Sequence, residues 1–142
     1  MKILNIYSKV NENKLLHMVC KLDEPEERQD MVPAENFIQC ALLNLQKGKT
    51  FPPHKHIKKD RRHKEQIAQE SWVVIRGSVK CFFYDLDDRL LETAILKPGD
   101  ASFTLEAGHT YEILEDNTVV YEFKTGPYEG QENDKEYINV KS

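Results

Sequence analysis

The residues best suited to chemistry are histidines and a glutamate that recur at intervals fitting short β-strands. His54 and His56 are one residue apart, Glu70 begins an apolar run, and His109 lies in a later segment, AGHTYEI. Alternate residues of an extended segment face the same side, so His54 and His56 can share one ion while Lys55 points away. Imidazole nitrogen and carboxylate oxygen suit divalent transition metals. The pattern therefore predicts that these three histidines and the glutamate hold one metal ion (Zn, Fe, Mn or Ni).

Residues near this set suggest how a substrate would be handled. Four protein ligands leave one or two positions open for water or substrate, as a catalytic metal requires. Tyr111 follows His109 by two residues and is a candidate proton donor, with packing in the core as the alternative. A basic run between the two halves of the set contains Lys58, Arg61 and Arg62. This run is expected to form a solvated loop or, in the functional interpretation, a phosphate-binding lip over the pocket in which Lys58, Arg61 and Arg62 bind the substrate.

Short strands separated by turn residues must position these side chains. Strands are expected at residues 3–7, 15–22, 70–76, 79–84, 90–96, 101–105, 111–114 and 118–123, and β-like sequence also begins at Asn36. Pro52 and Pro53 keep the approach to His54 extended. The acidic, proline-containing residues 23–33 are expected to form an exposed loop or one helical turn. Helical periodicity is nearly absent, so the sequence predicts an all-β fold, either a closed barrel or a sandwich.

Length and charge narrow the class of protein. The 142 residues fit a single domain over 1–142, with the barrel core expected at about 36–125. A net charge of -4 argues against nucleic acid as a partner. No apolar run is long enough to cross a bilayer, and the first residues do not resemble a signal peptide. We therefore expect a cytoplasmic protein with no membrane partner.

Three cysteines and one further histidine are interpreted as structural. Cys20, Cys40 and Cys81 are odd in number, widely spaced and flanked by apolar residues, so buried free thiols are expected. A catalytic cysteine is the alternative. His17 alternates with apolar residues and is expected to be a partly buried structural histidine.

Two motifs resemble those of the cupin superfamily. Gly48-x5-His54-x-His56 with Glu70-x6-Gly77 is similar to the first cupin motif, and Lys97-Pro98-Gly99-Asp100 followed by Gly108-His109 is similar to a degenerate second one. The interval between His56 and Glu70 is longer than in the family motif. The resemblance implies a jelly-roll barrel, the double-stranded β-helix, with the metal bound inside it.

A narrower resemblance covers residues from about 15 to 138. The phrases QESWVVIRGSV, AGHTYEILED and YEFKTGPYEGQENDKEY are similar to small cupin metalloproteins of the WbuC type. That family is found among enzymes of surface polysaccharide biosynthesis. The resemblance implies a similar setting for this chain. The leading hypothesis is a metal-dependent enzyme that acts on a sugar or nucleotide-sugar in an isomerase- or epimerase-like step.

Several alternatives remain open at this point. One is a metal-independent ketoisomerase or epimerase that uses His54 or His56 as a general base. Another is a non-catalytic cupin that binds a sugar or regulates a partner enzyme, and a third is an iron-dependent dioxygenase. The expected partner is a sugar or nucleotide-sugar, and pairing of exposed edge strands into a homodimer is a further expectation.

Overall fold

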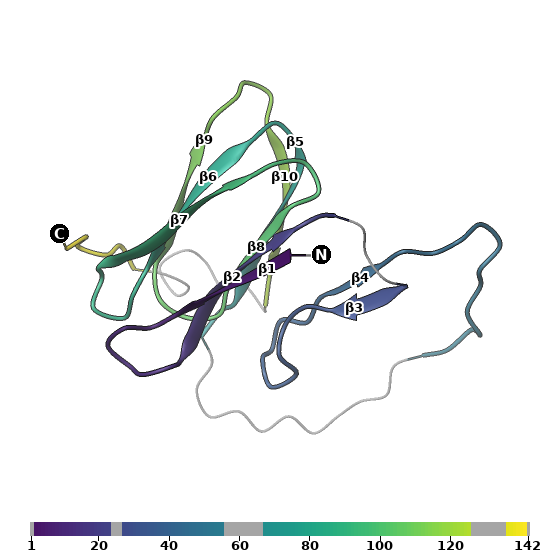
Figure 1. The fold of residues 1–142 in the computed structure, drawn as a ribbon, viewed down its shortest axis with the longest axis horizontal. Helices are drawn as coiled ribbons and strands as arrows, with labels where there is room; N and C mark the ends of the chain where they lie inside the picture. The colour runs from purple at the N-terminus through teal and green to yellow at the C-terminus, as the bar shows by residue number, and fades with distance from the viewer. Residues whose placement is uncertain (1, 24–26, 56–66, 126–135, 142) are drawn as a thin grey trace.

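The computed structural model describes residues 2–23, 27–55, 67–125 and 136–141, and these form an all-β structure (Figure 1). The described residues contain no helix, so the prediction of an all-β chain is confirmed. Every strand pair within these described ranges is antiparallel. No helical segment among the described residues has the length and apolar character to cross a bilayer.

The strands form three sheets. The five-stranded sheet contains, in spatial order, β1 (Lys2–Tyr7), β2 (Leu15–Lys21), β8 (Ala101–Thr104), β5 (Glu70–Arg76) and β10 (Val119–Lys124). The three-stranded sheet contains β7 (Leu90–Leu96), β6 (Val79–Tyr84) and β9 (His109–Ile113). The third sheet is a short hairpin of β3 (Arg28–Asp30) and β4 (Ala41–Leu43). Within the described residues these ladders remain separate sheets and do not close into a ring.

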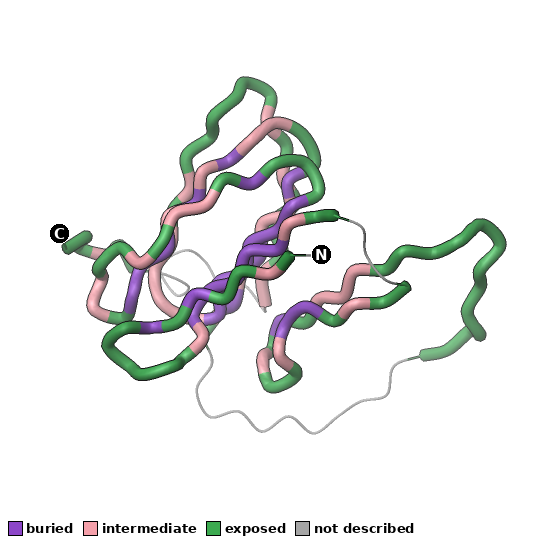
Figure 2. The backbone as a smooth tube through the Cα atoms, in the orientation of Figure 1, coloured by how far each residue is buried: buried purple, intermediate pink, exposed green. Residues whose placement is uncertain are grey.

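The two larger sheets pack face to face around the main core. Alternate residues of each strand face inward, as the period of two in the sequence predicts. Figure 2 shows the buried positions running along the strands where the two layers meet. The buried residues of this layer come from both sheets: Ile6, Val19, Val74, Val79, Cys81, Phe83 and Leu96.

A second apolar cluster covers the opposite face of the five-stranded sheet. It joins Met18, Cys20 and Phe103 of that sheet to Met31 and Ile38, which lie in the connection between β3 and β4. The expectation of an exposed loop or helical turn at residues 23–33 is therefore wrong at Arg28–Asp30, which form β3, and at Met31 and Val32, which are buried; residues 24–26 lie outside the described residues. Burial of Met31 and Val32 overrides the local acidic composition, because both side chains are removed from water by packing against the sheet.

The eight strands expected outside residues 23–55 all form, within one or two residues of their expected ends. The β-like sequence that begins at Asn36 yields only the three residues of β4. No strand is formed by the described residues 44–55, so the extended lead-in to His54 lies outside the sheets.

Gly77 ends β5 in the turn predicted for it. Its φ is +83°, a backbone conformation that side chains with a Cβ rarely adopt. A Cβ at this position would also lie 2.9 Å from the Cα of Thr118 and closer to its hydroxyl. Gly77 therefore permits both the turn and the close approach of the segment that leads into β10.

We expect Gly77→Ala to lower the free energy of unfolding by about 2–4 kcal/mol, from the positive φ together with the clash. Gly48→Ala is a matched control, because Gly48 has a φ of +90° but no other atom within 4 Å of the position that a Cβ would take. Gly48→Ala should cost about 1–2 kcal/mol. Urea denaturation of both variants measures the difference, and equal losses would contradict the role given to Thr118.

Candidate functional site

A row of polar side chains crosses the inner face of the five-stranded sheet. His17 on β2 is paired with Thr104 on β8, Thr104 with Glu70 on β5, and Glu70 with Lys124 on β10. Directly paired residues of neighbouring strands point to the same face. The same face carries Val19 and Val74 of the main core two and four residues further along their strands. The polar row is therefore the edge of the layer whose centre is apolar.

The facing sheet adds His109 and Tyr111 to this row. These two residues of β9 are two positions apart, so both face inward, and Tyr111 packs against the main core. His109 Nε2 lies 3.6 Å from Glu70 Oε1. Its other ring nitrogen, Nδ1, lies 2.8 Å from Thr104 Oγ1 and 3.2 Å from the Tyr111 hydroxyl. The side chains of His109 and Glu70 are 22% and 15% exposed, so water and small ligands can reach the pair.

The start of β5 is held in place by Gln69. Its backbone N–H donates to Thr125 Oγ1, and its carbonyl accepts from the N–H of Thr125. Its buried amide side chain bonds the segment after β3, accepting from the N–H of Ile38 at 2.9 Å and donating to Asn36 Oδ1 at 3.1 Å. Gln69 is thus held by hydrogen bonds to three residues, Thr125, Ile38 and Asn36, and this restrains the backbone that orients Glu70.

Burial and a neighbouring carboxylate change the acidity of Glu70. Burial, followed by the proximity of Glu122, raises the pKa of Glu70 from 4.5 to about 7. Lys124 Nζ, 3.7 Å from Glu70 Oε2, acts in the opposite direction and is outweighed. A carboxyl group with a pKa near neutrality can both take and give a proton at physiological pH.

Tyr111 is held rigidly beside the pair. Its ring stacks on Trp72 with centroids 3.8 Å apart and planes 5° from parallel. Trp72 in turn donates from Nε1 to Glu122 Oε1 at 3.3 Å. Burial raises the pKa of Tyr111, so its phenol stays protonated at neutral pH and keeps a proton to donate. Packing and a chemical role are both compatible with this geometry.

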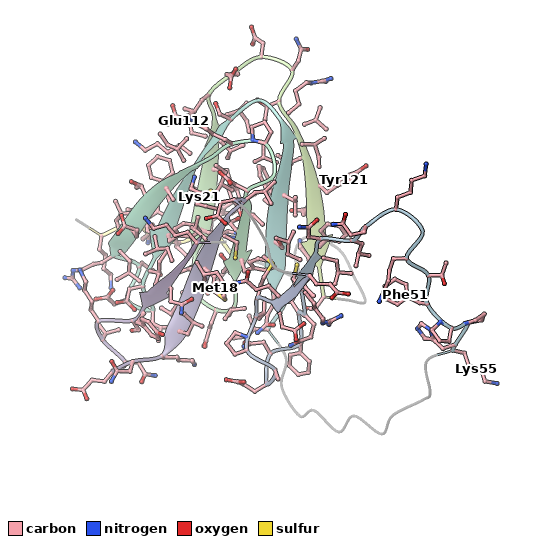
Figure 3. The ribbon with its side chains drawn as sticks, turned by 45° about the vertical axis from the view of Figure 1, so that its right-hand side comes forward. Met18, Lys21, Phe51, Lys55, Glu112 and Tyr121 are labelled. Atoms are coloured by element: carbon pink, nitrogen blue, oxygen red, sulfur yellow. The ribbon has the colours of Figure 1, made fainter. Side chains whose placement is uncertain are left out.

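The structure brings together three of the predicted site residues. Glu70, His109 and Tyr111 lie around one point between the sheets. His54 does not join them: it is exposed, and its Nδ1 lies 3.0 Å from the carbonyl of Pro52. Figure 3 shows the segment between Phe51 and Lys55 extending away from the two large sheets.

Four other predicted residues cannot be compared with the structure. His56, the proposed ligand, and Lys58, Arg61 and Arg62, the proposed phosphate-binding residues, lie outside the described residues. Their roles stay predictions. Among the described residues, no group of three or more His, Cys, Asp or Glu side chains is arranged to hold a metal ion. Glu70 and His109 are therefore a two-ligand arrangement in the part of the chain that can be described.

Sequence reasoning misses the partners of the pair. No sequence pattern singles out Thr104, Lys124 or Trp72, and the expectation for His17 is partial burial. His17 is fully buried. The sequence carries one usable signal, since His17 is in phase with Val19 and so shares its inward face. Pairing with Thr104 depends on strand register between distant segments, which the sequence does not display.

The cysteines behave as expected for structural thiols. Cys20 and Cys81 are buried, Cys40 is half-buried, and all three are free. Burial raises the pKa of Cys20 and of Cys81 to about 12, so both thiols are protonated at neutral pH. A protonated buried thiol is a poor nucleophile, which argues against the catalytic-cysteine alternative for these two residues.

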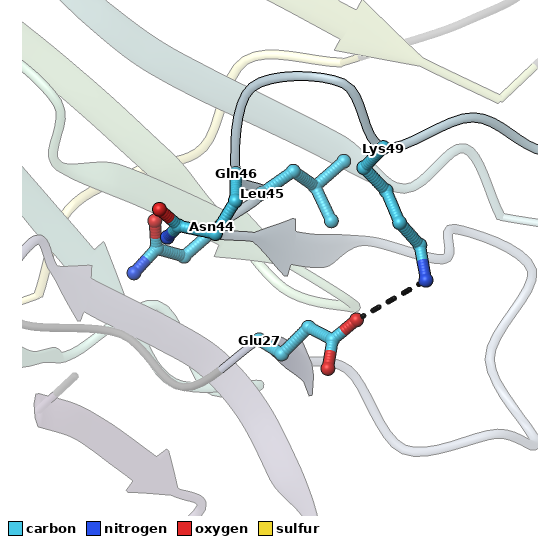
Figure 4. Close-up of a pocket in the computed structure, with 5 residues that line it drawn as sticks. All are labelled: Glu27, Asn44, Leu45, Gln46 and Lys49. Carbon is cyan, nitrogen blue, oxygen red and sulfur yellow. Dashed lines mark ion pairs between the residues drawn. The ribbon is translucent and has the colours of Figure 1, made fainter.

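A shallow pocket of about 280 Å³ lies elsewhere, beside the β3–β4 hairpin (Figure 4). It is lined by Glu27, Asn44, Leu45, Gln46 and Lys49. Lys49 Nζ and Glu27 Oε1 are 3.5 Å apart, and both side chains are well exposed. An exposed ion pair of this kind contributes little energy and no evident chemistry. The Glu70–His109 pair is therefore the better candidate site.

Comparison of the chain with models of known protein families, with curated proteins and with solved structures gave no match.

The raised pKa of Glu70 predicts a pH-dependent stability. The folded chain retains a proton between pH 4.5 and about 7 that the unfolded chain releases, so this contribution is full below pH 4.5 and is lost as the pH rises through 7. Its size is at most about 3 kcal/mol. Glu70→Gln should therefore flatten the pH dependence, with the variant more stable than the parent at pH 8.

Urea denaturation at pH 5 and pH 8, in the presence of a chelator, measures this effect. Glu112→Gln is the control, because Glu112 is an exposed glutamate on the outer face of β9 (Figure 3). It should keep the pH dependence of the parent chain. The same slope in the parent and in Glu70→Gln would contradict the prediction.

Proposed function

We propose that this chain is an enzyme with a cupin-type β-fold that moves a proton on a sugar or nucleotide-sugar, in an isomerase- or epimerase-like step. The observation that carries the proposal is the approach of Glu70 Oε1 and His109 Nε2 to 3.6 Å in a partly open position between two sheets. The resemblance of the two motifs to cupins of polysaccharide biosynthesis supports the substrate class. The antiparallel two-sheet architecture is compatible with the jelly-roll topology of that family.

Isomerisation and epimerisation need a base that removes a proton from the carbon beside a carbonyl and an acid that returns one. Glu70 or His109 Nε2 takes the proton, and the electron pair moves onto the carbonyl oxygen. The Tyr111 hydroxyl is the candidate donor to that oxygen. In an isomerisation the base returns the proton to the former carbonyl carbon, while the hydroxyl on the first carbon gives its proton to the Tyr111 phenolate and becomes the new carbonyl. In an epimerisation the enol hydroxyl gives its proton back to Tyr111, and an acid on the opposite face protonates the same carbon. The pKa of Glu70, about 7, suits both directions of transfer.

Lys124 gives the site a cation for substrate binding. Its Nζ lies 3.7 Å from Glu70 and its side chain is 24% exposed. An ammonium group here partly balances Glu70 and Glu122, and it can attract an anionic substrate group.

The first test uses hydrogen exchange. Chelator-treated protein is incubated in D2O with a panel of sugar phosphates and nucleotide-sugars, and we expect deuterium at the carbon beside the carbonyl of the true substrate. Glu70→Gln should lower the exchange rate by about 10²- to 10⁴-fold, the usual contribution of a general base. Glu112→Gln should leave it unchanged. Saturable binding with no exchange for any compound would instead indicate a sugar-binding protein without catalysis.

A second candidate keeps the same residues and adds a divalent metal. Two ligands that are each about 2.1 Å from a tetrahedral ion lie about 3.4 Å apart. The Glu70–His109 distance of 3.6 Å fits this spacing, so these two residues would hold the ion together with a third ligand such as His56. A bound ion would polarise a carbonyl or hydroxyl oxygen of the substrate.

Metal binding is tested on protein purified without chelator. We expect Glu70→Gln and His109→Gln each to weaken zinc binding more than about 100-fold, since even residues that only support a ligand contribute 10- to 100-fold. His54→Gln should bind zinc as the parent does, because His54 lies apart from the pair. Less than about 0.1 mole of any transition metal per mole of purified protein would exclude the metal-dependent function.

A further inference from the structure

We infer that His17 and Thr104 are positioning residues that fix the tautomer of His109, so that its proton lies on Nδ1 and its unprotonated Nε2 faces Glu70. The inference rests on the proposed function for its consequence, since Nε2 is the atom used there. The tautomer itself is a property of the folded chain and can be measured without any activity.

The chain of hydrogen bonds begins at the backbone carbonyl of Tyr84, which can only accept. His17 Nε2 lies 2.8 Å from the carbonyl oxygen of Tyr84. A carbonyl only accepts, so Nε2 of His17 carries a proton and donates it. The ring is also packed against Phe83, with centroids 4.9 Å apart, and is closed off from solvent.

Burial keeps His17 neutral. It lowers the pKa of His17 to about 4, although the Tyr84 carbonyl and the nearby Asp85 carboxylate act in the opposite direction. Asp85 already accepts hydrogen bonds from the Ser8 hydroxyl at 2.6 Å and from the N–H of Lys9 at 2.8 Å. With Nε2 protonated and the ring neutral, Nδ1 of His17 has a lone pair and accepts.

Thr104 transmits this choice to the second histidine. Its Oγ1 lies 3.0 Å from Nδ1 of His17 and 2.8 Å from Nδ1 of His109. A hydroxyl can donate only one hydrogen bond, and Nδ1 of the neutral His17 accepts the one from Thr104. The oxygen of Thr104 must then accept from His109, which places a proton on Nδ1 of His109. The Tyr111 oxygen, 3.2 Å from the same nitrogen, is a second acceptor for that proton.

The consequence lies at Nε2 of His109. In the neutral ring this nitrogen carries no proton, and it lies 3.6 Å from Glu70 Oε1. It can take a proton from a substrate or from Glu70, or bind a metal ion. The opposite tautomer would present an N–H there and would do neither. A hydrogen bond to the remote ring nitrogen is the usual means by which proteins orient a working histidine.

The test is nitrogen-15 NMR of the histidine rings in the full chain, chelator-treated and at pH 8, with His109→Gln used to assign the signals. Long-range proton–nitrogen correlations distinguish the two neutral tautomers. We expect His109 with its proton on Nδ1 and His17 with its proton on Nε2. A neutral His109 that carries its proton on Nε2 in the parent chain would overturn the inference, whatever the variants do.

Substitutions in the five-stranded sheet distinguish a positioning role of Thr104 from simple packing. Thr104→Val keeps the shape and removes the hydroxyl. Because the Tyr111 oxygen remains as the weaker acceptor, we expect a lower population of the His109 tautomer with its proton on Nδ1, and Thr104→Ser should retain the full population. Ser71→Ala is the matched control, because the Ser71 hydroxyl is buried in the same sheet but on its opposite face and, among the described residues, bonds neither histidine. It should leave the tautomer unchanged. A full population retained in Thr104→Val would contradict the relay.

Activity gives a separate result. If the substrate is found, Thr104→Val should lower kcat about 10- to 100-fold and Thr104→Ser should recover most of it. If no compound in the panel reacts, the proposed function fails while the tautomer result still stands or falls by itself.

Discussion

The hydroxyl of Thr104 is the point on which the site depends, because two imidazoles meet at one oxygen. Hydrogen bonds of 3.0 and 2.8 Å join it to rings from β2 and β9, which belong to opposite sheets. A polar group in such a layer is costly unless it is bonded. The two rings and the hydroxyl satisfy one another, and in doing so they fasten the two layers at this edge.

The rest of the site follows from where that edge lies. Toward the centre of the layer the inward positions are apolar, and Val19, Val74 and Phe83 are almost fully buried. Toward the edge the same faces carry Glu70 and Lys124, which stay partly exposed. The rigid core fixes the strands, and the strands fix the distance between Glu70 and His109. A carboxyl group with a pKa near neutrality results from a place that is neither fully dry nor fully solvated.

The other face of the five-stranded sheet has a different role. The β3–β4 hairpin covers it with Met31, Val32 and Ile38, and Gln69 links this cover to the start of β5. The cover therefore stabilises the strand that carries Glu70 without contributing a side chain to the site. Beyond β4 the chain leaves the sheets, and this is why His54 is exposed although its sequence suggested a site residue.

The sequence by itself determined eight of the ten described strands and most of their ends. Glycine and aspartate located turns such as that at Gly77, because this signal is local. Only the tertiary structure decided that His17 lies opposite Thr104 and Thr104 opposite Glu70. Register between strands far apart in the chain depends on how the whole core packs, and no short segment encodes it. For the same reason the sequence indicated Glu70 and His109 as partners, whereas their link to a buried third residue became visible only in the fold.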